Sequence, residues 1–334
     1  MDRVRTAVIG LGRFGELHAQ AYVHSPLADL VAVVTTTEAR AREVGAKLGV
    51  HWYTDFHAML KKEDVDAVSI SNRDADHMEP AIACARAGKH ILLEKPMAPT
   101  VEEADAIIDA VEEAGVKMMV NFINRFAPNY VAAYEAIERG DIGEIISIFS
   151  RRNGSRWAME TYGKWTDILI STGIHEIDAI TWYADSKVKR VYGESARFSV
   201  PQEQEDNVFM SLLRMENGTI GSLETSWSLP PSHPTYLEFR TDIAGTKGII
   251  SIDNSNRGMV VSTEEGCIYP DISLWPLQRG RVGGALREAL AHFLECILEN
   301  RDPIVGGAEG RHSLEVVMAI KESCRSGKPI EVNR

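Results

Sequence analysis

The amino-acid sequence predicts an α/β protein: an N-terminal doubly wound parallel sheet at residues 1–122, then a C-terminal α+β domain with an open, mainly antiparallel sheet at residues 123–334. Two observations predict the first domain. Short apolar runs alternate with helical stretches, which implies parallel strands joined by right-handed crossovers, and a glycine-rich turn follows the first apolar run. The second domain is predicted because strand-like runs follow one another from residue 188 onward, with turn signals between them.

The individual elements follow from these patterns, since short apolar runs are typical of buried strands. In the first domain we predict strands at residues 6–9, 30–34, 52–54, 67–71, 90–94 and 117–121, and helices at residues 14–25, 38–48, 56–61, 78–87 and 101–114. In the second domain we predict strands at residues 145–151, 188–192, 207–215, 218–226, 236–241, 248–253 and 258–263, and helices at residues 129–139, 174–183, 285–298 and 311–325. The last helix is expected to pack back on the first domain.

The glycine-rich turn is Gly10-Leu11-Gly12-Arg13-Phe14-Gly15. Gly10 permits the tight turn, Gly12 lets the backbone approach a pyrophosphate, and Gly15 lets the following helix pack on the sheet. That helix directs its N-terminal amides and the positive end of its dipole at the phosphates. The alternative is a chance GxGxxG in a loop. Because a strand precedes the turn and a helix follows it, we predict that residues 10–15 bind a dinucleotide.

Composition excludes several classes of protein. A chain of 334 residues with 44% hydrophobic residues is sufficient for two globular domains. A net charge of -12 argues against a non-specific nucleic-acid binder. The four cysteines lie far apart without a zinc pattern, so we predict no metal site and a reducing compartment. There is no apolar run of about twenty residues that would indicate a membrane segment. With a strand starting close to Met1, we expect no signal peptide and a cytoplasmic location.

Four segments carry a resemblance to a known family: residues 10–15, 87–96 with Glu94-Lys95-Pro96, 124–128 and 173–178. Over nearly its whole length the chain resembles the Gfo/Idh/MocA family of nicotinamide-dependent oxidoreductases, which includes inositol dehydrogenases and many sugar reductases. The resemblance implies a Rossmann domain, followed by a domain whose open sheet often forms an oligomer surface, hence a homodimer or homotetramer. It also implies oxidation of a ring hydroxyl, or reduction of the matching ketone, on a sugar or cyclitol.

Two residues are predicted to handle the proton of the substrate hydroxyl. Lys95 follows a buried strand at the edge where a doubly wound sheet binds its ligand, and burial beside an oxidised nicotinamide would lower a lysine pKa toward the working pH. By resemblance, His175 is the proton carrier or the hydrogen-bond partner of the reacting oxygen, and Asp178 orients it or the cofactor. The alternatives are an exposed lysine and a structural histidine. Ser171 stands where many relatives have an aspartate, which weakens the assignment to inositol dehydrogenases. Asp167 also carries a carboxylate, but it lies farther from His175 in the sequence.

The end of the second strand bears on the choice of nicotinamide. A carboxylate normally binds the adenine ribose there, but this chain has Thr35 and Thr36. Their hydroxyls, with Arg40 or Arg13, could bind a 2′-phosphate, so we favour NADP(H) while NAD(H) stays possible. Glu38 is the main argument for NAD(H).

Further site residues complete the prediction. On the cofactor side we add Asn72, Asp74, His77 and Glu94. On the substrate side, where aromatic faces and fixed donors suit sugar rings, we predict Asn121, Arg125, Arg152, Trp157, Trp165, Ser171, Asp178 and His233 besides Lys95 and His175. The alternative for each of these substrate-side residues is simple packing. Two other functions share this fold: an NAD-dependent glycoside hydrolase, and a non-catalytic dinucleotide-binding regulator, which would not need Lys95 and His175.

Overall fold

The computed structural model describes residues 3–197, 206–254, 258–264 and 266–332. The chain forms two compact units, and each is made of two segments. Unit 1 comprises Met1–Phe126 and Ser273–Arg311, and unit 2 comprises Ala127–Ile272 and His312–Arg334. The sequence analysis placed two consecutive domains with a boundary at residue 122, whereas in the structure residues 273–311 return to the first unit.

Unit 1 is built on a six-stranded parallel sheet with the order β3-β2-β1-β4-β5-β6. The direction of winding changes between β1 and β4, which is where sheets of this type bind dinucleotides. The strands are β1 (Val4–Ile9), β2 (Ala28–Val34), β3 (His51–Tyr53), β4 (Ala67–Ile70), β5 (His90–Leu93) and β6 (Met118–Val120).

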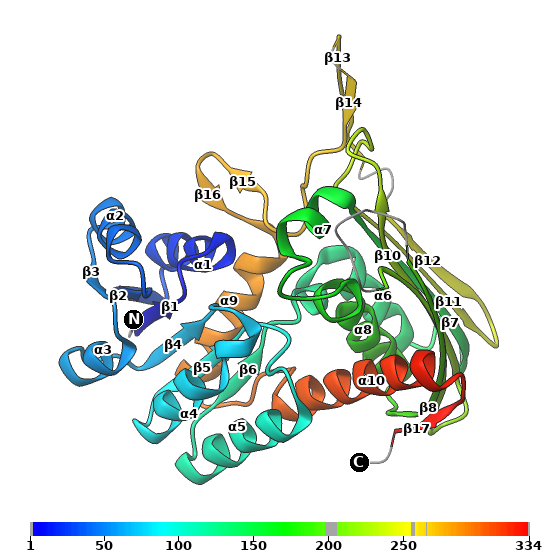
Figure 1. The fold of residues 1–334 in the computed structure, drawn as a ribbon, viewed down its shortest axis with the longest axis horizontal. Helices are drawn as coiled ribbons and strands as arrows, with labels where there is room; N and C mark the ends of the chain where they lie inside the picture. The colour runs from blue at the N-terminus through cyan, green and yellow to red at the C-terminus, as the bar shows by residue number, and fades with distance from the viewer. Residues whose placement is uncertain (1–2, 198–205, 255–257, 265, 333–334) are drawn as a thin grey trace. The chain divides into compact units, whose positions relative to one another are not determined.

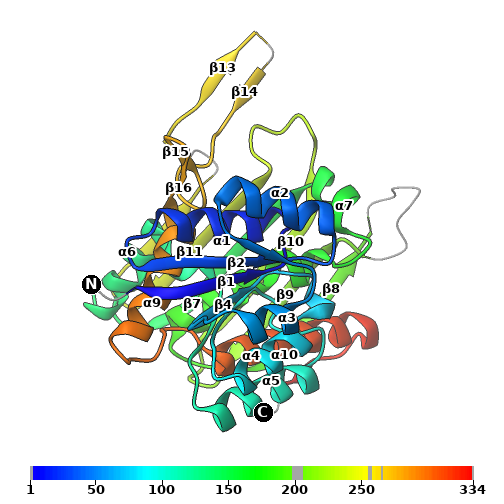
Figure 2. The same cartoon turned by 90° about the vertical axis from the view of Figure 1, so that its left-hand side faces the viewer.

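Helices cover both faces of this sheet (Figures 1 and 2), with α1 and α2 on one face and α4 and α5 on the other. Helix α9 packs beside α1, burying Leu286, Leu290, Phe293 and Leu294 on one side of the helix. The helices are α1 (Arg13–His24), α2 (Glu38–Leu48), α3 (Phe56–Lys62), α4 (Met78–Arg86), α5 (Val101–Ala114) and α9 (Gly284–Leu298). Short 3-10 turns lie at Asp74–Asp76 and Ile123–Phe126. A hairpin joins β15 (Leu277–Gln278) to β16 (Arg281–Val282).

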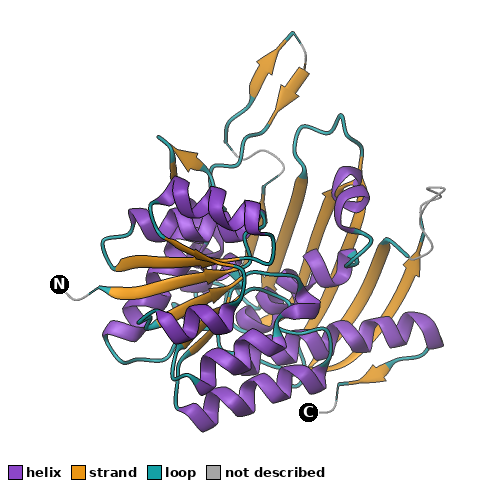
Figure 3. Cartoon of the chain, turned by 60° about the vertical axis from the view of Figure 1, so that its left-hand side comes forward, coloured by secondary structure: helices purple, strands orange, loops and turns teal. Residues whose placement is uncertain are grey.

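Unit 2 is built on a seven-stranded sheet with the order β12-β11-β7-β10-β9-β8-β17, in which β7 and β10 are parallel and the other neighbours antiparallel. Its helices gather on one face of the sheet (Figures 1 and 3). The strands are β7 (Ile145–Ser155), β8 (Val188–Ala196), β9 (Val208–Met215), β10 (Ile220–Leu229), β11 (Leu237–Gly245), β12 (Ile249–Asp253), β13 (Val261–Thr263), β14 (Gly266–Ile268) and β17 (Ile330–Glu331). The helices are α6 (Pro128–Glu138), α7 (Arg156–Tyr162), α8 (Ile174–Ala184) and α10 (Gly307–Ser326). The first turn of α10 belongs to unit 1.

The predicted fold class is confirmed in both parts. Strands β1, β4 and β5 of unit 1 are buried along nearly their whole length, because helices cover both faces of the sheet. In unit 2, β9 alternates buried and exposed side chains, because helices cover one face only. Within the described ranges, every helix is too short or too polar to cross a bilayer, and all four cysteines are free thiols.

Candidate dinucleotide and proton-transfer site

The glycine-rich turn connects β1 to α1, and its three glycines meet different surroundings. Gly10 has φ +91°, and a Cβ at this position would lie 2.3 Å from the Asn72 amide nitrogen. A Cβ at Gly15 would lie 1.8 Å from the Gly10 carbonyl oxygen. At Gly12, in contrast, a Cβ would meet no heavy atom within 4 Å. Gly10 and Gly15 are therefore required by the fold, and Gly12 faces open space, as a backbone that approaches a pyrophosphate must.

The N-terminus of α1 is also arranged for an anion. Gly12 is the N-cap residue, and no side chain caps the helix there. The first amides of this helix thus lack the usual side-chain acceptor, and the helix dipole favours negative charge at the same place. Ser71 holds the turn from the neighbouring strand end by donating to the Gly10 carbonyl oxygen at 3.1 Å. These residues fit the pyrophosphate of a dinucleotide.

Glu94 lies at the end of β5 in a nearly buried polar network. Its carboxylate accepts hydrogen bonds from Asn121 Nδ2 at 2.6 Å and from His18 Nε2 at 3.1 Å, and one oxygen lies 3.3 Å from the Lys95 amide nitrogen. Burial disfavours the charged form, but the hydrogen bond from His18 and the charges of His18 and Lys95 outweigh it, and the Glu94 pKa is lowered. The network fixes a carboxylate directly before Lys95.

Lys95 is half-buried after β5 and is joined to Pro96 by a cis peptide bond. Two residues that follow β4 lie near it. Burial raises the Asp74 pKa, partly offset by the positive charges of Lys95 and His77. His77 is fully buried with Nδ1 2.9 Å from the Pro96 carbonyl oxygen, and burial lowers its pKa. The structure therefore brings four of the predicted residues together at the carboxyl ends of β4 and β5: Asp74, His77, Glu94 and Lys95.

The remaining predicted residues of unit 1 lie at neighbouring strand ends. Asn72 donates from Nδ2 to the Asp76 carbonyl oxygen at 2.7 Å, and so shapes the turn after β4. Asn121 is buried in the Glu94 network, as described above. Arg125 is 6% exposed and donates from Nη1 to the Ile304 carbonyl oxygen at 3.1 Å. This hydrogen bond ties the returning segment to the rest of unit 1.

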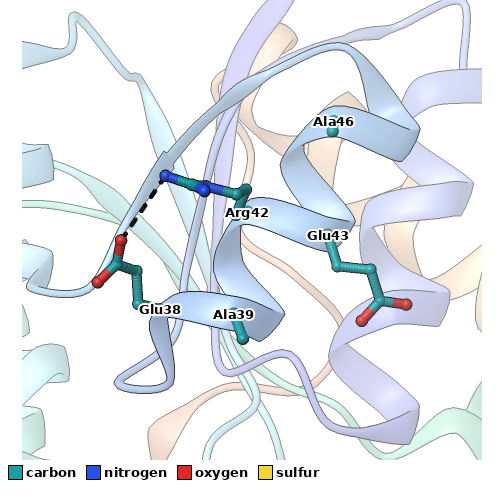
Figure 4. A pocket seen from close by; sticks show the side chains of 5 residues that line it. All are labelled: Glu38, Ala39, Arg42, Glu43 and Ala46. Carbon is teal, nitrogen blue, oxygen red and sulfur yellow. Dashed lines mark ion pairs between the residues drawn. The ribbon is translucent and has the colours of Figure 1, made fainter.

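At the end of β2, Thr35 is half-buried and Thr36 is exposed. Arg40 from the first turn of α2 points toward the glycine-rich turn, where its Nε donates to the Leu11 carbonyl oxygen at 3.2 Å. The outward side of α2 carries a shallow recess lined by Glu38, Ala39, Arg42, Glu43 and Ala46 (Figure 4). Arg42 and Glu38 form an ion pair across it at 3.9 Å.

In unit 2, a π-helix at Leu169–Gly173 leads directly into α8. Such π-helical turns are frequent at functional sites. Ser171 lies in this turn, and His175 and Asp178 follow one helical turn apart, 7% and 0% exposed. Asp167 forms an ion pair with Lys321 and accepts a hydrogen bond from the Ile170 amide, so it fixes the start of the π-helix.

Arg152 and Glu176 form a buried ion pair in unit 2, with Nη1 2.7 Å from Oε1 and exposures of 2% and 0% for the two side chains. The carboxylate also accepts from Ser150 Oγ at 2.5 Å and from the Tyr130 hydroxyl at 3.3 Å. Arg152, predicted as a substrate ligand, thus anchors the first turn of α8 to β7. Glu176 was not among the predicted residues, although an acid between Ile174 and Ile177 in an apolar helix is a signal for a buried, paired carboxylate.

The other predicted substrate residues of unit 2 lie near the protein surface. Trp157 in α7 is 47% exposed, and Trp165 in the loop that follows is 58% exposed. His233 is held by its own turn, with Nδ1 3.0 Å from the Thr235 carbonyl oxygen, and its Nε2 lies 3.8 Å from Glu238. Large exposed aromatic side chains of this kind suit a binding surface.

Comparison with known protein families covers almost the whole chain. Residues 4–122 match the model of an oxidoreductase family with an NAD-binding Rossmann fold, and residues 134–332 match the C-terminal α/β domain of the same family. The chain belongs to the Gfo/Idh/MocA oxidoreductase family. Membership confirms the predicted family and the predicted class of enzyme, a nicotinamide-dependent oxidoreductase.

Members of the Gfo/Idh/MocA family with known activities are similar along their full length. The scyllo-inositol 2-dehydrogenase (NAD(+)) of Bacillus subtilis is 32% identical, and the match covers 99% of this chain and 97% of that protein. The myo-inositol 2-dehydrogenase of Thermotoga maritima is 28% identical, with 98% of each chain covered. The crystal structure of apo scyllo-inositol dehydrogenase from Lactobacillus casei superimposes with a TM-score of 0.87 at 25% identity, covering 99% of this chain and 98% of that one.

Proposed function

We propose that this protein transfers a hydride between a nicotinamide dinucleotide and a ring hydroxyl, or the matching ketone, of a cyclitol or sugar. One observation carries the proposal. Half-buried Lys95 lies beside Asp74, His77 and Glu94 at the carboxyl edge of the parallel sheet, and the glycine-rich turn that fits a pyrophosphate follows another strand at the same edge. The inositol dehydrogenases named above support the substrate class.

In the proposed mechanism, Lys95 and His175 handle the proton, and the nicotinamide, when bound, accepts or returns the hydride. Removal of the hydroxyl proton as the C–H bond breaks requires a positioned base. The positive charge of Lys95 interacts with the fixed carboxylate of Glu94, which favours transfer of the hydroxyl proton to the lysine side chain in oxidation. In reduction Lys95 returns that proton to the substrate oxygen. His175, buried at the start of α8, hydrogen-bonds the reacting oxygen, and Asp178 on the same helix orients it.

For the cofactor we propose NADP(H) in preference to NAD(H). Thr35 and Thr36 leave the end of β2 without a carboxylate that would repel a 2′-phosphate, and Arg13 is exposed in the first turn of α1. The Bacillus subtilis relative is named for NAD(+), which argues for NAD(H). A comparison of kcat/KM with the two cofactors decides between them.

The sheet of unit 2 supports the proposal of a homodimer or homotetramer. The face opposite its helices carries Met210, Leu212, Ile220 and Ile249, between 42% and 65% exposed. Strand register places these four side chains on the same face. An exposed apolar face of this kind is typical of an interface between subunits, and light scattering coupled to size-exclusion chromatography measures the subunit number. A cytoplasmic location stays a prediction.

The proposed activity is tested by the absorbance of reduced nicotinamide, with NAD+ and NADP+ separately and a panel of cyclitols, free sugars, sugar phosphates and glycosides. Cofactor reduction by cyclitols or sugars in the wild-type protein, lost in Lys95→Met while dinucleotide still binds, is the expected result. Release of sugar from a glycoside without net cofactor reduction would instead identify a hydrolase. Tight dinucleotide binding without turnover in either direction would identify a regulator.

A further inference from the structure

Arg40 belongs to a cluster of charged side chains that links α1 to α2 behind the glycine-rich turn. Its guanidinium forms ion pairs with Glu16 of α1 and with Glu43, the latter at 3.1 Å. Glu16 in turn pairs with Lys47 at 2.6 Å and accepts from Gln20 at 3.2 Å. Two cations thus face two carboxylates, and the cluster has no excess positive charge with which to attract a phosphate.

The remaining contact of Arg40 is with the turn itself. Its Nε donates to the carbonyl oxygen of Leu11, the residue between Gly10 and Gly12, at 3.2 Å. Leu11 is buried and the Arg40 side chain is 31% exposed, so this hydrogen bond is partly shielded from water. Arg40 therefore fixes the direction of the Leu11 carbonyl group.

Planarity of the peptide bond extends this effect to Gly12. The Leu11–Gly12 bond is trans, since Lys95–Pro96 is the cis bond found among the residues described. In a trans peptide the carbonyl oxygen and the following N–H point in opposite directions. Holding the Leu11 oxygen toward Arg40 therefore aims the Gly12 N–H away from the cluster, and Gly12 borders the open space that fits a pyrophosphate.

We propose that Arg40 is a positioning residue for the pyrophosphate-binding amide of Gly12, held in place by Glu16, and not a ligand of a 2′-phosphate. This inference rests on the proposed dinucleotide site and deepens it. It also replaces the role that the sequence analysis gave to Arg40. Recognition of a 2′-phosphate is left to Thr35, Thr36 and Arg13.

Three ligands separate the two roles of Arg40: ADP-ribose and NADH, which carry the pyrophosphate alone, and NADPH, which adds the 2′-phosphate. Isothermal titration calorimetry measures Kd for each with wild-type protein and with Arg40→Met. A positioning role predicts that Kd rises by a similar factor of about ten for all three ligands, equivalent to about 1.4 kcal/mol. A rise confined to NADPH, or no rise for any ligand, would overturn the inference.

Glu16→Gln provides an independent test, since it keeps Arg40 and releases it from its strongest partner. Positioning predicts weaker binding of all three ligands, whereas a 2′-phosphate ligand freed from its carboxylate would bind NADPH more tightly. The matched control is Arg42→Gln, which changes an arginine on the same helix that forms an ion pair with Glu38 (Figure 4) and lies over the Trp52 ring; its Kd values are expected to equal those of the wild type. Circular dichroism confirms that each variant is folded.

Failure of the inference differs from failure of the proposed function. Binding of all three ligands by wild-type protein without turnover of any substrate would refute the oxidoreductase function and leave the role of Arg40 standing. Absence of binding to any of them would refute the dinucleotide site and the role of Arg40 with it.

Discussion

Replacing Gly12 by alanine adds one methyl group at the point where the backbone is expected to approach the cofactor. Gly12 has φ −70° and ψ −166°, which alanine adopts without strain. The added Cβ meets no heavy atom of the protein within 4 Å. Gly12→Ala therefore leaves the folded protein intact and places the methyl group against a bound pyrophosphate.

The expected magnitudes follow from these surroundings. Alanine reduces the entropy of the unfolded chain, which stabilises by about 0.4–1 kcal/mol, and is a poorer N-cap than glycine by about 0.5–1 kcal/mol. The two effects nearly cancel, so Tm should change by less than about 4 °C. A methyl group in the pyrophosphate contact should raise Kd for NADH and NADPH by about 30-fold or more, equivalent to about 2 kcal/mol.

Gly15→Ala is the matched comparison, because its Cβ would lie 1.8 Å from the Gly10 carbonyl oxygen and 2.6 Å from Ser71 Oγ. Overpacking of this kind costs about 1–3 kcal/mol, so Tm should fall by about 2–12 °C. Differential scanning fluorimetry gives Tm, and calorimetric titration gives Kd. Wild-type affinity in Gly12→Ala would show that the dinucleotide does not approach this turn, and the reasoning would be refuted.

Three further changes have distinct expected outcomes. The Glu94 pKa is lowered from 4.5, so the ionised carboxylate stabilises the fold above pH 4.5, and this stabilisation is lost as the pH falls below that value. In Glu94→Gln the urea midpoint should therefore fall less steeply with decreasing pH than in the wild type. An unchanged slope would contradict this expectation. Glu176→Ala leaves Arg152 buried without its carboxylate and should lower the free energy of unfolding, measured by urea titration, by about 3–5 kcal/mol. Changing both Glu176 and Arg152 to methionine should recover most of this loss. Equal losses of stability in the single and the double variant would argue against a charge effect. Thr35→Asp should shift kcat/KM toward NAD(H), and a constant ratio would mean that the 2′-phosphate is not read at this position.

The features that were predictable from sequence are those whose physical cause is local. The turn at residues 10–15 was predictable because its glycine spacing, between an apolar run and a helix, is a local sequence pattern. The position of Lys95 after a buried strand was also predictable, since the strand is a local apolar run; its part in proton transfer stays a prediction. Strand and helix alternation in the first third of the chain likewise reflects short-range periodicity.

The contacts that were not predicted join partners distant in the sequence. The ion pair between Arg40 and Glu16, on another helix, leaves no pattern in the sequence. The ion pair between Arg152 and Glu176 was not predicted either, since the two residues meet only when α8 packs on β7; a role of Arg152 at the substrate stays a prediction. The amphipathic pattern of residues 285–298 predicts a helix, but not the unit on which its apolar side packs.

The chain crosses between its two units three times, after residues 126, 272 and 311. During synthesis, the apolar surface of α1 that α9 covers stays exposed until residues 284–298 have emerged, after nearly the whole second sheet has been made. Contacts of such large sequence separation slow folding, because a long loop must close before they form. A fragment that ends at residue 126 would therefore keep an open apolar flank and is expected to aggregate, because the first unit is complete only when residues 273–311 have joined it.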